Sequence, residues 1–390
     1  MGLKLDNLVS LMTLDEKIAF LSQTAPAIER LGIKSFTNFT EGLHGLGWAG
    51  GGSITSTQFP QAIGMASTWD PDLLRQVGAA VGYETRIHNV KTDGKRVGLA
   101  LRAPLVDVGR EPRWGRNEEA YGEDPFLDGS LALERNRTRT DSVIDERDLR
   151  EYLLVPFQKT ISEGHAQSFM VAYNLLNGAP CTAHPKLRGI VMKEWGFDGM
   201  ICTDAGGMPN LMRSQGVVSS LPKAVAMAIQ AGVTVFRDQH SSYFREAIEK
   251  NLLTEADIVD RVRGDLRMRM RLGEFGPPAL VPYSAIAGKE EPWYGPEHKA
   301  LARLVTDKSI VLVKNEGSIL PLNRSTIHSV AVSGGGGNEV FPDWYADTLP
   351  YAVTPAENKQ HRSTKDENNF RCSGRSCGHT RHRHAPRPGR

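Results

Sequence analysis

Residues 199–207 have the sequence GMICTDAGG, in which a short apolar run leads into a carboxylate and then into small residues. The run at residues 200–203 has the brevity and continuous apolar character of a strand that is buried on both faces of a parallel sheet. In a parallel α/β barrel, side chains at the carboxyl ends of the strands face the active site. Asp204 is therefore a candidate nucleophile or base, although its position is equally compatible with a carboxylate that caps the following helix.

Short apolar runs of the same kind recur at residues 99–108, 168–173 and 233–236, and amphipathic segments lie between them. This alternation of helices with buried strands indicates an α/β fold. It continues to about Phe275, and a stretch of this length suits a (β/α)8 TIM-like barrel, which typically has ~250 residues. From the pattern alone, a doubly wound open sheet is the alternative.

Helix starts and a second unit can also be placed. Asp70 suits an N-cap position before a proline, and Thr254 suits another with an acidic residue three positions later, so helices are predicted after both. A second α/β unit is predicted to contain a helix around residues 296–315 and a strand at residues 329–333. From about Ala356 the sequence has hardly any apolar residues, so a disordered basic tail is predicted.

The composition suits a globular protein with a sizeable core, because 40% of the 390 residues are hydrophobic and 24% are charged. A formal net charge of +2 gives no reason to expect nucleic acid or an anionic membrane as a partner. No stretch approaches the ~20 apolar residues of a membrane span. The N-terminus has no basic-then-apolar signal, so the chain as written is expected to be cytoplasmic, or secreted or periplasmic if its true start lies upstream.

The cysteines predict neither a disulfide scaffold nor a metal site. Four cysteines are too few for a scaffold built on disulfides. Cys181 and Cys202 lie in apolar surroundings and are expected to be reduced core residues. The spacing of Cys372, Cys377 and His379 matches no zinc pattern, so no metal is predicted.

Two further polar clusters could carry chemistry. Residues 107–116 bring arginines, carboxylates and Trp114 into one loop. Such a loop could clamp hydroxyl groups and offer a flat face to a sugar ring, or it could simply be braced by its own ion pairs.

Glu41 and His44 are three residues apart and could both reach one ligand. A polyol suits them better than a metal, because no third ligand is near, and structural pairing within the loop is as good an interpretation.

At these clusters the chain resembles glycoside hydrolase family 3, the β-glucosidase and β-xylosidase family. The matching segments occur in the family's order and cover nearly everything from the N-terminus to about Pro355. They are MTLDEKIAFL, TEGLHG, FPQAIGMASTWD, GREPRWGRNEEAYGEDP, TDSVIDERDLREYLLVPF, MVAYNLLNGAPC, KEWGFDGMICTD, SIVLVKNEGSILPL and EVFPDWYADTLPYAVTP.

The resemblance implies a hydrolase of small β-glycosides or oligosaccharides that needs no cofactor. It also implies an N-terminal (β/α)8-type barrel and an α/β sandwich domain, with the active site between them. The expected boundaries are a barrel at residues 1–280, a linker at 281–305, a partial sandwich domain at 306–355 and the basic tail at 356–390. The expected substrates carry terminal, non-reducing β-D-glucosyl or β-D-xylosyl residues.

A retaining mechanism is also implied by the resemblance, in which a carboxylate attacks the anomeric carbon and water later releases the glycosyl-enzyme. Asp204 matches the family's nucleophile. Glu41 matches the acidic residue that binds sugar hydroxyls, and Arg116 matches the arginine that contacts the sugar. Tyr173 lies where the family often lines the pocket.

Two departures from the family's pattern affect these expectations. The family's Lys-His pair, which hydrogen-bonds to sugar hydroxyls, normally occupies a barrel strand between the GEDP and TDSVIDERDLRE segments. Here residues 134–136 join those segments almost directly, so a gap in the barrel wall is expected. The family's general acid/base usually lies well beyond YAVTP, where the resemblance stops, so no residue is assigned that role. The alternative to an active hydrolase is an impaired remnant that at most binds sugar.

Overall fold

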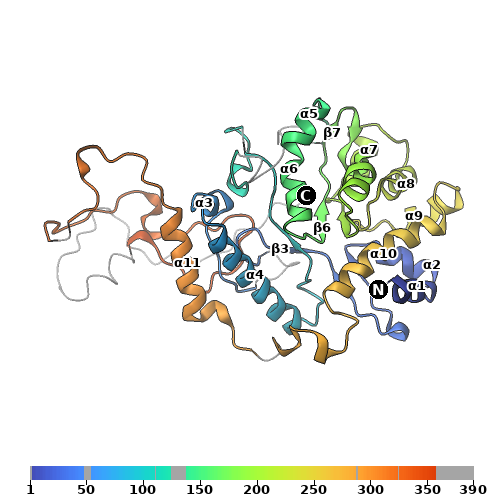
Figure 1. Ribbon diagram of the computed structural model, residues 1–390, viewed down its shortest axis with the longest axis horizontal. Coiled ribbons are helices and arrows are strands. Elements are labelled where there is room, and N and C mark those ends of the chain that lie inside the picture. The colour runs from blue at the N-terminus through green and yellow to red at the C-terminus, as the bar shows by residue number, and fades with distance from the viewer. Residues whose placement is uncertain are drawn as a thin grey trace. The chain divides into compact units, whose positions relative to one another are not determined.

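The computed structural model describes residues 2–47, 54–109, 111–123, 138–286, 289–323 and 325–356 (Figure 1). The chain divides into two compact units. The first comprises Met1–Leu320 together with Pro342–Pro350, and the second comprises Pro321–Phe341 together with Tyr351–Arg390. Strands β1 to β9 all belong to the first unit.

Parallel strands around β9 (Met200–Cys202) form the centre of the first unit. On one side, β6 (Ser168–Met170) pairs with β9 in parallel. On the other side, the segment 233–236 forms a parallel bridge to β9 and another to Ser22. Every residue of β9 is buried, as predicted for a strand that is covered on both faces. The predicted strands at β6 and β9 are confirmed, although both are shorter than their apolar runs.

A second parallel pair consists of β3 (Thr40–Glu41) and β4 (Leu101–Arg102), in which Glu41 lies opposite Arg102. The strand predicted at residues 99–108 is therefore present only over β4. Among the described residues, no strand pairs with the second edge of β4 or with the second edge of β6. Without a neighbour on that side, the chain after β4 has no ladder partner with which to continue as a strand.

Short antiparallel pairs and small helices complete the first unit. The pairs are β1 (Thr24–Ala25) with β2 (Phe36–Thr37), and β7 (Leu175–Leu176) with β8 (Ala179–Pro180), while β5 (Asp141–Ser142) is parallel to β7. The small helices are α5 (Glu146–Asp148), α6 (Val155–Ser162) and α7 (Gly207–Arg213).

The two helix starts predicted from sequence are confirmed by their hydrogen bonds. Asp70 caps α4 (Pro71–Lys91), because its carboxylate accepts a bond of 3.0 Å from the backbone N–H of Leu73. Thr254 caps α10 (Glu255–Arg271) through a reciprocal capping box with the acidic residue three positions later. These local signals fix where the long helices begin.

Two hydrophobic cores hold the helices in place. The larger core packs β9 against α10 and against α1 (Gly2–Ser10), α2 (Leu14–Phe20), α8 (Leu221–Ala231) and α9 (Ser241–Glu249). The smaller core joins α4 to α3 (Ala62–Ala66) and α11 (Pro296–Ser309), which lies beside α4 in Figure 1. No helix of the described ranges is both long enough and apolar enough to cross a membrane.

The predicted second α/β unit is only partly present. The helix predicted at residues 296–315 ends at Ser309, and residues 329–333 form no strand. Val330 is 50% exposed and Val332 is 42% exposed, so this apolar run has no neighbouring strand with which to pair. The predicted tail beyond Ala356, with its two cysteines and histidine, lies outside the described residues.

Candidate active site

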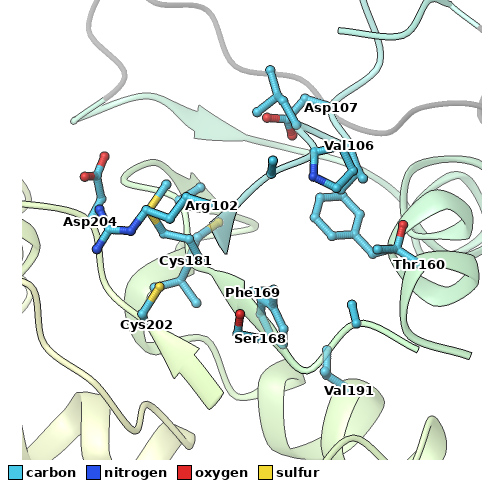
Figure 2. Close-up of a pocket in the computed structure, with 18 of the residues that line it drawn as sticks. Arg102, Val106, Asp107, Thr160, Ser168, Phe169, Cys181, Val191, Cys202 and Asp204 are labelled. Atoms are coloured by element: carbon cyan, nitrogen blue, oxygen red, sulfur yellow. The ribbon is translucent and has the colours of Figure 1, made fainter. Parts of the chain in front are cut away.

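A cavity of about 580 Å³ opens at the carboxyl ends of β3, β4, β6 and β9 (Figure 2). The four residues predicted from sequence to form the site, Asp204, Glu41, Arg116 and Tyr173, all line this cavity. They come from segments as far apart as residues 41 and 204, and the parallel arrangement of the strands brings them together. Figure 2 shows Asp204 and Arg102 at one end of the cavity.

Away from Asp204, Asp107 and Thr160 also line the cavity (Figure 2). Its apolar lining residues include Phe157 and Ile161 of α6, Phe169 of β6 and Val191. Residues of β4 and of β6 both line the cavity, and no described strand pairs with the second edge of either. In the sequence, the missing barrel strand is predicted between these two strands.

Asp204 follows β9 and is held in place by two hydrogen-bond donors. Nη1 of Arg237 lies 2.9 Å from its Oδ1, and the backbone N–H of Ala205 donates to the same oxygen at 2.7 Å. The following helix, α7, has Gly206 as its N-cap residue, with no side-chain cap. The interpretation of Asp204 as a helix cap is therefore wrong, and its carboxylate instead faces the cavity, with 19% of the side chain exposed.

Tyr173 stabilises the loop that carries this carboxylate. Its hydroxyl donates a hydrogen bond to the carbonyl oxygen of Ala205, the residue after Asp204. Gly206, the next residue, donates its backbone N–H to Asp238 at 2.6 Å. Tyr173 thus both lines the cavity and fixes the backbone beside the candidate nucleophile.

Glu41 is a buried carboxylate at the end of β3. Burial raises the pKa of Glu41, and the negative charges of Asp204 and Glu119 act in the same direction. The positive charges of Arg102 and Arg237 oppose this shift. Glu41 is therefore electrostatically coupled to Asp204, and its acceptor oxygens face a site that also contains hydrogen-bond donors.

Arg116 reaches the cavity in a fixed orientation because Glu119 holds it. Its Nε and Nη2 donate to the two carboxylate oxygens of Glu119 at 2.8 and 2.5 Å, and Nη2 lies 3.4 Å from the hydroxyl of Tyr345. Burial disfavours the charge of Arg116, but the hydrogen bonds and charge of Glu119 raise its pKa above the usual value. Because both bonds run to the same carboxylate, they fix the orientation of the guanidinium group.

Several described residues of the loop at residues 107–116 do not line the cavity. Glu111 and Arg113 form their own pair, with Arg113 side-chain exposure of 86%. Trp114 is buried and is not among the residues that line the cavity. The hypothesis that Trp114 offers its face to a sugar is therefore wrong, since its ring is buried and does not line the cavity.

Glu41 and His44 do not converge on one ligand, contrary to the sequence interpretation. His44 is buried, with Nδ1 3.0 Å from the carbonyl oxygen of Phe59 and Nε2 3.0 Å from Oδ1 of Asp343. Burial opposes the charge of Asp343, but hydrogen bonds from His44, from Gln61 and from the backbone lower its pKa to about 2. His44 thus anchors residues 342–350.

The anchored segment supplies part of the cavity wall. Trp344 and Tyr345 line the cavity, and a Cβ atom at Gly47 would overlap the carbonyl oxygen of Tyr345. Thr348 of the same segment forms a parallel bridge with Thr55. Glycine at position 47 therefore permits a close approach that brings a distant stretch of sequence to the site.

Sequence reasoning did not identify Arg102, Arg237 or Tyr345 as site residues. Arg102 ends β4 and Arg237 directly follows the apolar run 233–236, so the rule that identified Asp204 applies equally to them. Tyr345 gives no local signal, because its contact with Arg116 spans 229 positions.

Within the described residues, no group of three or more histidines, cysteines and acids could hold a metal ion. Cys181 and Cys202 line the cavity as free cysteines. Burial raises the pKa of the Cys181 thiol to about 12 and raises that of Cys202 as well. Both thiols are therefore protonated at neutral pH. Cys202 is a buried core residue, as predicted, whereas Cys181 is only partly buried and lies in none of the core clusters.

Comparison with known families places this geometry in context. The chain matches the glycosyl hydrolase family 3 N terminal domain in two segments, residues 18–138 and 128–267. The overlap of the two segments lies where residues 134–136 join the GEDP and TDSVIDERDLRE stretches. The family match therefore spans all four strands at the cavity, β3, β4, β6 and β9.

Curated relatives include plant β-xylosidases. The chain is 31% identical over 387 residues to a probable β-D-xylosidase 7 of Arabidopsis thaliana, with 87% of this chain and 50% of that protein covered. It is 31% identical to β-D-xylosidase 3 of the same plant, with 86% and 48% covered. The chain thus spans about half the length of the curated relatives it matches.

Solved structures agree with these relatives. A family 3 exo-β-xylosidase in complex with a xylobiose aziridine activity-based probe has a TM-score of 0.83 at 26% identity, with 92% of this chain and 51% of that chain covered. A β-glucosidase from Erythrobacter marinus has a TM-score of 0.68 at 26% identity, with 83% and 52% covered. With the family match across more than half of its length, the chain belongs to glycoside hydrolase family 3.

Proposed function

We propose that this protein hydrolyses terminal, non-reducing β-D-xylosyl or β-D-glucosyl residues with retention of configuration, and that Asp204 is the nucleophile. The observation that carries the proposal is the position of Asp204 at the carboxyl end of β9, in a cavity that it shares with Glu41 and three arginines. Relatives named as β-xylosidases favour xylosides as the first substrates to test.

Four polar residues of the cavity have a task in this mechanism. An oxygen of Asp204 bonds to the anomeric carbon while the bond from that carbon to the leaving oxygen breaks, and the leaving oxygen takes up a proton. Water then attacks the anomeric carbon, loses a proton and releases the β-sugar, which restores the Asp204 carboxylate. The hydrogen bond from Arg237 orients that carboxylate, and Glu41 and Arg116 bind hydroxyls of the sugar.

We also propose that the first unit is a (β/α)8-type barrel that is interrupted between β4 and β6. The parallel pairs β3–β4 and β6–β9 support this arrangement, as does the bridge from β9 to the segment 233–236. In this account the apolar part of the cavity is the space of the missing strand, and the polar end keeps its geometry because its side chains come from the strands that remain.

Retention and the role of Asp204 can be tested together. Hydrolysis of 4-nitrophenyl β-D-xyloside and of the matching glucoside is followed by proton NMR, with the wild-type chain and the Asp204→Asn variant. We expect the β-anomer to form first and the Asp204→Asn variant to be inactive. Initial formation of the α-anomer, or full activity of the variant, would refute the proposal. Binding of D-xylose without turnover of either glycoside would instead support a sugar-binding remnant.

A further inference from the structure

Arg102 is a buried cation whose hydrogen-bonding groups are unused. It stands at the end of β4, its side chain is only 10% exposed, and it lines the cavity beside Asp204 (Figure 2). Its Nε, Nη1 and Nη2 atoms are all buried without a hydrogen-bond partner. Buried polar atoms normally have partners, and a buried charge without them destabilises the fold.

The other two arginines of the cavity differ in this respect. Arg237 donates to Asp204 at 2.9 Å, and Arg116 donates to Glu119 through two nitrogens. Nη1 of Arg102 lies 4.0 Å from Oε1 of Glu41, which is close enough for attraction between charges but too far for a hydrogen bond. Beneath the guanidinium is the ring of Phe39, with Cζ 4.7 Å from the ring centroid. The ring of Phe39 thus covers one face of Arg102, while its buried N–H groups have no hydrogen-bond partner.

The space between Arg102 and Glu41 suits a hydroxyl group. A hydroxyl oxygen that lies beside the pair can accept a hydrogen bond from Arg102 and donate one to Glu41, each with an O···N or O···O distance of about 2.8 Å. An anionic ligand fits less well, because Glu41 and Asp204 both line the same end of the cavity. The pair therefore matches a neutral polyol.

We propose that Arg102 is a substrate-binding residue, and that its guanidinium donates a hydrogen bond to a hydroxyl of the sugar whose anomeric carbon faces Asp204. This inference rests on the proposed function, since it takes the end of the cavity at Asp204 as the sugar site. Arg102 and Glu41 both form hydrogen bonds with the same hydroxyl, to which Arg102 donates and from which Glu41 accepts. The ligand supplies the partners that Arg102 lacks in the free protein.

The test uses Arg102→Met, Arg102→Lys and a control, Arg86→Met. Arg86 is stacked over Tyr283, with its Cζ 3.7 Å from the ring centroid, and it does not line the cavity. Each variant is assayed with 4-nitrophenyl β-D-xyloside and with its 2-, 3- and 4-deoxy analogues. Binding of D-xylose and of the three deoxyxyloses is measured by titration calorimetry, and thermal unfolding is recorded for each variant.

We expect Arg102→Met to lower kcat/KM and xylose affinity by about 10- to 100-fold, with Arg102→Lys between it and the wild type. With the wild type, kcat/KM for one deoxy analogue should be lower than for the parent xyloside by the same factor. With Arg102→Met, that analogue and the parent xyloside should have equal kcat/KM, because the same hydrogen bond is already absent. The unfolding temperature of Arg102→Met should not fall, since methionine removes an unsatisfied buried cation. Arg86→Met should keep the wild-type kcat/KM.

Three results would overturn the inference. The first is that Arg102→Met keeps the wild-type kcat/KM. The second is that, for all three deoxy analogues, the loss of kcat/KM from the missing hydroxyl adds to the loss from Arg102→Met. The third is that activity is lost only together with a lower unfolding temperature. The binding measurements separate this inference from the proposed function. If the wild type binds D-xylose without turnover and Arg102→Met does not bind it, the inference stands and hydrolysis is refuted; absence of both binding and turnover in the wild type refutes both.

Discussion

Arg237 donates a hydrogen bond to Asp204, with Nη1 2.9 Å from Oδ1, across the parallel bridge that joins β9 to the segment 233–236. Both side chains are mostly buried, at 17% and 19% exposure. A charge-assisted bond in a shielded site is stronger than one in water and fixes the direction of the carboxylate. Under the proposed mechanism, the orientation of Asp204 towards the anomeric carbon depends on Arg237.

Replacement of Arg237 should reduce catalysis without abolishing the cavity. In Arg237→Met, Asp204 keeps the backbone N–H of Ala205 but loses its charged partner, so kcat/KM for 4-nitrophenyl β-D-xyloside should fall about 10- to 100-fold. Arg113→Met is the matched control, because Arg113 is exposed and pairs only with Glu111 among the contacts described above. A wild-type rate in Arg237→Met would show that the pair does not orient the nucleophile.

The leaving group should have a strong influence on the rate. None of the described carboxylates in the cavity is assigned as the acid that protonates the departing oxygen. An aryl leaving group needs little such help, whereas an alkyl leaving group loses a general-acid contribution of ~10²–10⁴-fold. We therefore expect turnover of 4-nitrophenyl β-D-xyloside and very slow turnover of methyl β-D-xyloside. Similar rates for the two would show that an acid acts within the site.

The bond between His44 and Asp343 should stabilise the fold in a pH-dependent manner. The pKa of Asp343 is about 2 in the folded protein, below its ordinary 3.8. Its stabilising contribution is therefore present above about pH 4 and is lost as the pH falls towards 2. Asp343→Asn should lower the free energy of unfolding by about 1 to 2 kcal/mol at pH 7, allowing for solvent screening, and by little at pH 2.

Urea unfolding at both pH values measures this difference. Asp72→Asn is the control, because the Asp72 side chain is 86% exposed, and it should change the free energy of unfolding by less than about 0.5 kcal/mol. Equal destabilisation by Asp343→Asn at pH 7 and pH 2 would contradict the assignment of the effect to the ionised carboxylate.

Filling the apolar end of the cavity should raise stability. Val191 is buried and lines the cavity (Figure 2). If the cavity includes the space of the missing strand, as proposed above, a larger side chain there gains contacts. Val191→Phe is expected to raise the free energy of unfolding by about 0.5 to 2 kcal/mol. Val143→Phe, at an 84% exposed position, should have little effect. A loss of stability in Val191→Phe would mean that the space is already filled.

Local sequence signals predicted those parts of the fold that neighbouring residues determine. Asp70 and Thr254 fix the starts of α4 and α10 through bonds to residues three positions away. The apolar run before Asp204 predicts β9, because a buried parallel strand needs apolar residues on both faces. These features do not depend on distant parts of the chain.

Other features depend on contacts between distant segments and could not be predicted in this way. His44 was placed beside Glu41 by sequence spacing, yet its partner Asp343 is 299 positions away. Arg102 lies within one apolar run and Arg237 directly follows another, and they come together only when the strands assemble in parallel. The strand predicted at residues 329–333 fails for the same reason, since a strand forms only where a neighbour completes its hydrogen bonds.

The central claim, that Asp204 forms a covalent bond with the sugar, is tested most directly by trapping the glycosyl-enzyme. The protein is incubated with 2,4-dinitrophenyl 2-deoxy-2-fluoro-β-D-xyloside and with the matching glucoside, and its intact mass and peptides are measured. We expect one fluoroglycosyl group per chain, attached to Asp204, and no adduct with the Asp204→Asn variant. Folded protein that forms no adduct with either reagent, or an adduct on another residue, would contradict the account.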